Sequence, residues 1–226
     1  SFCQRADAVL AELRHAGLHV RPRDALLQQH LPQPLRRELA AYARQSRRDS
    51  ALIAEVRLDN VSVAADALVG AQDGALPAIE RALDYGIAAM CAEAVGIMTA
   101  LNEATLEYLK TRKQFGQPIG RFQALQHRMV DMVIATEQAR SMAMMAAVKA
   151  DSTDTAERRR AISAAKAYIG QQARFVGQQA VQLHGGMGVV DELNVSHYFK
   201  RLTMIDLTFG NADHHLGLFS DTLLAA

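Results

Sequence analysis

The sequence has no tryptophan and only two cysteines and five prolines among 226 residues, and aromatic residues make up 5% of it. Its two cysteines, Cys3 and Cys91, favour a reducing compartment and exclude both a disulfide framework and a thiolate zinc site. The chain also lacks a signal-peptide pattern and an uninterrupted apolar run of roughly 18 residues. We therefore expect a soluble, cytoplasmic protein without a membrane span.

Neither sign of charge is in large excess. Lysine and arginine number 25 and acidic residues 24, a net charge of +1, which does not favour nucleic acid or an anionic membrane as a partner. Residues 1–50, however, hold nine arginines, five acidic residues and no lysine. A solvated arginine face is one interpretation of this ill-defined helical segment, and a phosphate-rich partner is the alternative.

Alanine, methionine and glutamine are abundant, and this mixture favours helices. From residue 75 onward, apolar residues recur at steps of three to five, without a sheet-like alternation. The predicted helices run from Ala75 to Arg112, from about Arg121, from about Ala156 to Leu183, after Gly188, and after Gly210. We therefore predict a mainly α protein with a four-helix up-down bundle over residues 71–226.

The spacing of the apolar residues is different in the stretch that precedes the predicted bundle. Residues 51–64 come close to strict alternation of apolar and polar side chains, which predicts short strands. We place the only β-structure in this stretch. Residues 51–70 are then the end of a β-domain, a short β remnant ahead of the helices.

Two helical faces are predicted to form the core. The first helix contributes Ile79, Leu83, Ile87, Met90, Ala94, Ile97, Leu101, Leu106 and Leu109. The second contributes Phe122, Leu125, Met129, Met132, Val133, Thr136, Ala139 and Ala143. We interpret the methionines as core-filling side chains rather than as a recognition surface. Thr155 is taken as the start of the third helix.

The stretch RKQFGQPIG, residues 112–120, lies between the first two predicted helices. Its glycines and proline predict the turn of a helical hairpin. Within four positions, Arg112 offers a forked cation suited to phosphate, Gln114 an amide, and Phe115 an apolar ring. These side chains indicate a ligand site. The alternative is a capped turn with Phe115 in the core.

The stretch QLHGGMG, residues 182–188, lies at the predicted end of the third helix. Gly185 and Gly186 can adopt positive φ and leave backbone N–H groups uncovered, where they can face a phosphate or a ribose. The alternative is a simple helix cap. His184 is interpreted as a hydrogen-bonded histidine rather than a metal ligand.

His214 and His215 are adjacent and point to different faces of a helix, so they do not readily chelate one ion. No cysteine or glutamate stands at a useful spacing from them. We predict no metal site.

These stretches together, with AEAVG (92–96), Tyr108 and FQALQ (122–126), resemble the C-terminal helical domain of the acyl-CoA dehydrogenases. The resemblance covers about residues 52–223, because VRLDNVSVAADALVG is similar to the end of that family's β-domain. LNEATLEYLKTRKQFGQPIGRFQALQHRM and HYFKRLTMIDLTFGNADHHL resemble the small subunits of hetero-oligomeric, pimeloyl-CoA dehydrogenase-like enzymes.

The resemblance implies a flavoprotein oxidoreductase of fatty acid metabolism. In that family FAD takes a hydride from the β-carbon of an acyl-CoA, a carboxylate removes the α-proton, and the electrons pass to an electron-transfer flavoprotein. The implied assembly is a homo-oligomer, or a hetero-oligomer with a homologous dehydrogenase subunit.

Both motifs are implied to reach across a dimer interface to the FAD of a neighbouring subunit. Arg112 would pair with the pyrophosphate, Gln114 and Phe115 would line the nucleotide, and Gln123 would contact the same dinucleotide. In the second motif, the resemblance implies that Gln182, Gly185 and Gly186 hold the adenosine and phosphate end of FAD.

The catalytic base does not follow the family pattern. The common base is a glutamate immediately before a glycine in the loop ahead of the last helix, and Phe209 stands there, before Gly210. Some relatives carry the base on the first long helix, at the position of Gly86. Neither residue accepts a proton. Glu93 and Asp213 are the remaining candidates, and the base itself is not predicted.

Full members of the family begin with a helical domain and a complete β-domain, which residues 1–50 do not resemble. The leading hypothesis is an FAD-dependent acyl-CoA dehydrogenase subunit or truncated form. One alternative is a catalytically silent partner that completes the FAD site of a homologous active subunit. The other is a helical scaffold without a cofactor.

Overall fold

The computed structural model describes residues 45–46, 52–53, 70–71 and 73–224. The chain divides into two compact units, Ser1–Ala82 and Leu83–Ala226. In the first unit, strand β1 (Gln45–Ser46) pairs antiparallel with β2 (Leu52–Ile53). The predictions for the remainder of residues 1–50 and 51–70 lie largely outside the described residues.

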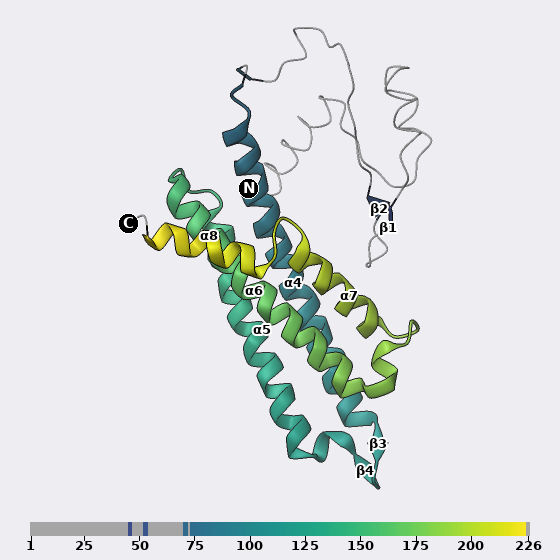
Figure 1. Ribbon diagram of the computed structural model, residues 1–226. Helices are drawn as coiled ribbons and strands as arrows, with labels where there is room; N and C mark the ends of the chain where they lie inside the picture. The colour runs from purple at the N-terminus through teal and green to yellow at the C-terminus, as the bar shows by residue number, and fades with distance from the viewer. Residues whose placement is uncertain (1–44, 47–51, 54–69, 72, 225–226) are drawn as a thin grey trace. The chain divides into compact units, whose positions relative to one another are not determined.

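From residue 76 the chain is helical (Figure 1). Five helices follow: α4 (Leu76–Thr111), α5 (Gln123–Lys149), α6 (Thr155–His184), α7 (Asn194–Leu207) and α8 (Ala212–Leu224). The connections contain β3 (Lys113–Gln114), β4 (Gln117–Pro118) and the 3₁₀ helices η2 (Ile119–Arg121) and η3 (Gly185–Val189). Helices α4 to α7 form the predicted up-down bundle, in which side-chain contacts join α4 to α5, α6 and α7, and α8 packs on α6. The mainly α prediction is confirmed.

The core is built from alanine, methionine and a few branched side chains. Met98, Leu101, Met132, Ile162 and Ile169 are among the most deeply buried side chains, and many buried alanines lie between them. Small alanines let helices approach closely, while the unbranched methionines fill the gaps that remain. The interpretation of methionine as core filler is confirmed for these positions and wrong for Met144, which is exposed.

Three of the predicted core residues of α4, Ile79, Leu83 and Leu106, are exposed instead. Leu106 follows Leu101 by five residues, a rotation of about 500°, so it lies roughly 140° away from the buried stripe. Thr105, one turn after Leu101, is buried in its place. The same argument applies to Val133 on α5, which is exposed beside the buried Met132.

Helix α6 begins at Thr155 as predicted, but its cap is the preceding residue. The Asp154 carboxylate accepts hydrogen bonds from the backbone N–H groups of Ala156 at 2.9 Å and Glu157 at 3.1 Å. These are two of the N–H groups that have no partner within the helix. The sequence prediction missed this cap inside a polar turn.

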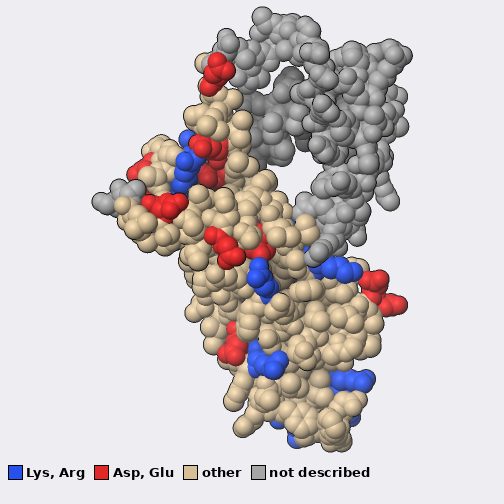
Figure 2. All heavy atoms as spheres, viewed as in Figure 1, with Lys and Arg blue, Asp and Glu red and all other residues tan. Residues whose placement is uncertain are grey.

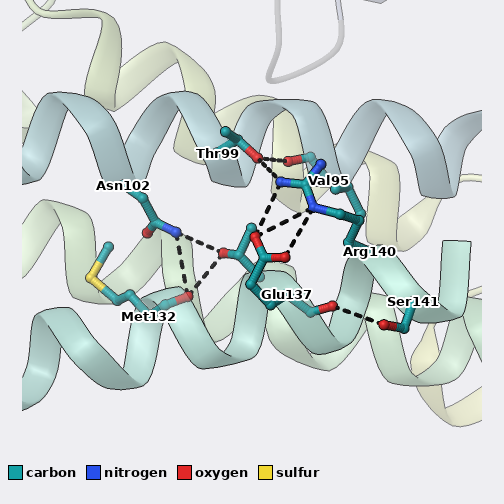
Figure 3. Close-up of polar contacts among 8 residues, drawn as sticks. Val95, Thr99, Asn102, Met132, Glu137, Arg140 and Ser141 are labelled. Carbon is teal, nitrogen blue, oxygen red and sulfur yellow. Dashed lines mark hydrogen bonds and ion pairs between the residues drawn. The ribbon is translucent and has the colours of Figure 1, made fainter.

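Polar side chains fix the register between α4 and α5 (Figure 3). Asn102 donates to the Thr136 hydroxyl at 2.9 Å, and Thr136 donates to the Met132 carbonyl. Near the middle of the interface, Arg140 bonds both Glu137 on its own helix and Thr99 on α4. Buried polar groups with several partners specify one packing arrangement more sharply than apolar contacts do.

Helix α4 is also joined to the later helices by ion pairs. Arg158 at the start of α6 donates to Asp84 at 2.8 Å in a buried pair. Arg201 on α7 donates to both carboxylate oxygens of Glu93, at 2.6 and 2.8 Å. These bonds hold α4 between its neighbours.

By length and composition alone, α4 is the one helix within the described ranges that is apolar enough to cross a membrane. Its stripe of Cys91, Ala94, Met98 and Leu101 is completely buried in the bundle. The core helix of a soluble protein has this property too, so the composition of α4 is explained by its place in the bundle.

Candidate functional site

The segment between α4 and α5 is a tight β-hairpin followed by one 3₁₀ turn. Lys113 pairs with Pro118 and Gln114 with Gln117, and the two tip residues, Phe115 and Gly116, have φ values of 53° and 78°. Two successive left-handed residues are typical of the turns that close two-residue hairpins. The predicted turn is confirmed. The prediction that residues 51–64 hold the only β-structure is wrong, because β3 and β4 form a second small sheet.

Phe115 does not enter the core. Its side chain is 89% exposed, and its ring meets Phe122 edge to face with centroids 6.0 Å apart. The alternative in which Phe115 is tucked into the core is therefore wrong. A residue at the tip of a two-residue hairpin is carried away from the bundle, which explains the exposure.

The glycine pair follows the last residue of α6 directly. Gly185 has a φ of 60°, and its N–H donates to the Gln182 carbonyl as the cap of the helix. A Cβ added to Gly185 or Gly186 would meet nothing within 4 Å, so both glycines border open space. Both interpretations of the turn are therefore compatible with the structure. Gly185 caps the helix, and the glycine pair leaves room for a ligand to approach the backbone closely.

The hairpin and the glycine pair meet at one cleft of about 500 Å³. It brings together five of the seven predicted cofactor-binding residues: Arg112, Gln114, Gln182, Gly185 and Gly186. Phe115 and Gln123 are not among its lining residues. The cleft volume is within the range of small-molecule sites, about 300–1,000 Å³.

The structure adds lining residues that sequence reasoning did not assign to the site. Ile119, Leu125 and Met187 supply apolar surface, and Tyr108 and His184 lie beside them. Leu125 had been placed in the core by its helical period, because periodicity does not distinguish a core stripe from a cleft wall. Tyr108 was part of the motif set, but no role was predicted for it.

His184 is a hydrogen-bonded histidine, as predicted. Its Nδ1 lies 2.8 Å from the Ala180 carbonyl, and its ring stacks on that of Tyr108. Burial lowers the pKa of His184 below its ordinary value, and the bond to Ala180 opposes this only in part. The imidazole is therefore neutral near neutral pH, and the guanidinium of Arg112 is the cationic group in the cleft lining.

The electrostatic character of the site is local. The Arg112 side chain is exposed and forms no ion pair within the described part of the chain. On the face shown in Figure 2, acidic side chains are more frequent toward the top and basic side chains toward the lower end. The net charge of the chain is only +1, and Arg112 is the cationic residue in the cleft lining that can attract an anion at short range.

The candidate proton acceptors lie outside the cleft lining. Glu93 is held by both of its oxygens to Arg201, as described above, and Asp213 is exposed in the first turn of α8. The two family base positions, however, come together: the ring of Phe209 packs against Gly86. Among the described residues there is no group of three or more histidine, cysteine or acidic side chains that could hold a metal ion.

Comparison with known proteins identifies the family to which the helical domain belongs. Residues 73–224 match the family model for the acyl-CoA dehydrogenase C-terminal domain. The probable acyl-CoA dehydrogenase YngJ of Bacillus subtilis is 34% identical over 160 residues, covering 71% of this chain and 42% of YngJ. The chain spans less than half the length of the curated relatives it matches.

Two solved structures show the same fold. Butyryl-CoA dehydrogenase from Megasphaera elsdenii superposes with a TM-score of 0.75 at 26% identity, over 81% of this chain and 48% of that one. The FAD complex of PigA superposes with a TM-score of 0.61 at 30% identity, over 67% and 39% respectively. The chain belongs to the acyl-CoA dehydrogenase family, and the part that matches is the C-terminal helical domain.

Proposed function

We propose that this chain supplies the phosphate-binding end of an FAD site in an acyl-CoA dehydrogenase, as a subunit or a shorter form of the enzyme. The observation that carries the proposal is the shared cleft of Arg112 and the Gly185–Gly186 turn. These elements are distant in sequence and have chemistry that suits the same ligand. A guanidinium fork and uncovered backbone next to glycine are both suited to a diphosphate.

The residues of the cleft fit FAD in kind. Arg112 would bind the diphosphate, and the amides of Gln114 and Gln182 can donate to phosphate or ribose oxygens and accept from hydroxyl groups. The two glycines admit the ligand close to the main chain. When bound, FAD would supply the hydride acceptor for α,β-dehydrogenation of an acyl-CoA, while these side chains would hold and orient its phosphate end.

The proposed assembly contains more than this chain's bundle. By analogy with the family, a second protomer would contribute the flavin-ring pocket, either as another copy or as a homologous dehydrogenase subunit. The proposed substrate is an acyl-CoA thioester and the proposed electron acceptor an electron-transfer flavoprotein.

A second candidate function is a catalytically silent partner of an active homologous subunit. It is favoured by the chemistry at the two family base positions, where Phe209 and Gly86 offer no proton acceptor. Two carboxylates near these positions in the sequence are already engaged, Asp84 with Arg158 and Asp206 with Arg174, while Asp213 is exposed at the start of α8. In this form the chain would complete a flavin site whose proton abstraction takes place on the other subunit.

The FAD proposal is tested by substituting the guanidinium. The full chain is purified with its flavin, and FAD affinity is measured for wild type, Arg112→Ala and Arg121→Ala by titrating the flavin-free protein. Loss of a charge-assisted hydrogen bond, about 1.5–3 kcal/mol, should weaken binding by Arg112→Ala roughly ten- to hundredfold. Arg121 is exposed on the same connection but outside the cleft lining, so its variant should bind as wild type does.

Equal FAD affinity in wild type and Arg112→Ala, or no FAD binding by wild type, would reject the proposal. The two catalytic forms are then separated by assaying acyl-CoA oxidation by the chain alone and after mixing with a homologous subunit that carries the glutamate. Turnover by the chain alone supports an active enzyme, whereas turnover only in the mixture supports the silent partner.

A further inference from the structure

We infer that the stacked Tyr108–His184 pair positions the two halves of the cleft, setting the gap between the Arg112 hairpin and the Gly185–Gly186 turn. The inference rests on the proposed function, because the ligand concerned is the diphosphate of the same dinucleotide. It gives Tyr108 and His184 a positioning role, for which the sequence motifs alone provided no assignment.

Each ring is carried by a residue that lies next to one half of the cleft in the sequence. Tyr108 lies in the last turn of α4, and its carbonyl accepts the N–H of Arg112 at 2.9 Å. His184 is the last residue of α6 and immediately precedes Gly185. A shift of either ring therefore moves main chain that carries a proposed phosphate-binding group.

The contact between the rings is close and has two components. The ring centroids are 4.4 Å apart with an interplanar angle of 29°, and the Tyr108 hydroxyl donates to the His184 carbonyl at 3.4 Å. That long hydrogen bond joins the last turn of α4 to the last residue of α6. The stack is thus the main specific contact between the end of α4 and the glycine turn.

The His184 side of this contact is rigid. Its ring is anchored to α6 by the bond from Nδ1 to the Ala180 carbonyl, and the residue is only 5% exposed. The far end of the turn is also packed, since a Cβ at Gly188 would lie 2.5 Å from the Val181 carbonyl oxygen. With the turn fixed to α6 on both sides, Tyr108 is the ring through which the end of α4, and the hairpin that follows it, meets the turn.

Small changes in this gap matter because one diphosphate must satisfy both halves at once. Hydrogen bonds to phosphate weaken steeply once donor and acceptor separate beyond about 3.2 Å. The glycines have no side chains that could change conformation to keep contact with a displaced ligand. A displacement of the hairpin would therefore remove one set of contacts while the other is kept.

The test uses the full chain and measures two quantities, FAD affinity and hydrogen exchange of residues 184–188 without ligand. Tyr108→Ala and His184→Ala remove the stack, whereas Tyr108→Phe and His184→Phe keep a flat ring. Tyr85→Ala is the matched control, because Tyr85 is a partly buried, hydrogen-bonded tyrosine on the same helix but outside the cleft lining.

We expect both alanine variants to weaken FAD binding about tenfold, the upper end of what an aromatic pair contributes, and to speed exchange in the glycine turn. The phenylalanine variants should restore most of the affinity and slow exchange. Tyr85→Ala should lower the thermal midpoint without changing the FAD affinity.

Three results with the variants would overturn the inference. Wild-type affinity in both alanine variants would show that the stack does not set the gap. Weakened affinity with unchanged exchange would make the rings direct ligand contacts instead of positioning residues. An equal loss of affinity in Tyr85→Ala would show that the effect is general destabilisation.

Failure of wild type to bind FAD would reject the proposed function and this inference together. FAD binding by wild type with unaffected affinity in the variants would reject this inference alone.

Discussion

The ring of Phe209 lies so close to Gly86 that a Cβ built on the glycine would stand 3.2 Å from Cε2 of the ring. Phe209 has a left-handed φ of 60° in the loop before α8, and Gly86 is in α4. These are the two positions at which the family resemblance places the proton acceptor. A Cβ at position 86 would be tight against the ring, so the contact favours a glycine there while phenylalanine stands at position 209.

This contact predicts an energetic coupling between Gly86 and Phe209. Alanine is favoured over glycine within a helix by about 0.5–1 kcal/mol, so Gly86→Ala should stabilise a Phe209→Ala protein by that amount. With the ring present, the new methyl group must displace it, and the gain should shrink or reverse. Urea unfolding of the two single variants and the double variant measures the coupling. Additive free energies of unfolding would show that the ring does not press on this position.

A second prediction concerns Lys166, which is 1% exposed. Its ammonium donates to the carbonyls of Ile205, Asp206 and Gly210 at 2.8, 2.7 and 2.9 Å, so all three of its donors are used. These carbonyls lie at the end of α7 and in the loop that carries Phe209. Lys166→Met should cost about 3–5 kcal/mol in the free energy of unfolding, because three buried acceptors lose their donor.

The matched control for Lys166 is Lys200→Met, which removes an ion pair with an exposed Asp191. Its effect on the urea midpoint should be much smaller, since exposed pairs are screened by solvent. Similar losses in the two variants would contradict a special role for the buried ammonium.

The buried Asp84–Arg158 pair gives a third prediction. Arg158 also donates to the Ser152 carbonyl at 2.9 Å, so it joins α4 to the turn before α6. Asp84→Ala leaves the buried guanidinium without its counterion and should cost about 3–5 kcal/mol. Asp84→Ala combined with Arg158→Met should cost less than the sum of the single changes, as measured by chemical unfolding. Strict additivity would show that the two side chains do not act as a pair.

The fourth prediction is a dependence of stability on pH. Burial lowers the pKa values of His184 and His215 from 6.5, so below that pH the unfolded chain binds more protons than the folded chain. The free energy of unfolding is therefore greatest above pH 6.5 and falls as the pH drops through the lowered values, by at most about 1.4 kcal/mol per pH unit for each histidine.

Urea unfolding at a series of pH values measures this slope. His215→Gln should flatten it between pH 6.5 and 4.5, above the range in which carboxylates such as Glu157 begin to contribute. The pKa of Glu157 is lowered from 4.5 chiefly by its hydrogen bond with Lys149, so its effect appears only at lower pH. An unaltered slope in His215→Gln would contradict the assignment.

Sequence periodicity was sufficient for the helices because an amphipathic stripe and a local turn signal are properties of neighbouring residues. Helix α4 extends over almost the whole predicted range, and the turn of residues 112–120 was recognised from its glycines and proline. The ability of Arg112 and of the glycine pair to bind phosphate could also be predicted from the sequence. A guanidinium or a missing Cβ has the same chemical properties in any fold. These features the sequence determined by itself.

Which side chains meet was decided by tertiary packing. Phe115 and Leu106 have the hydrophobicity of core residues, yet one stands at a hairpin tip and the other is turned away from the buried stripe. The stack of Tyr108 on His184 and the contact of Phe209 with Gly86 join residues far apart in the chain, and no local pattern encodes them. Only the relative placement of α4, α6 and the loop before α8 brings these pairs within contact distance, because helix packing fixes distances that sequence spacing leaves open.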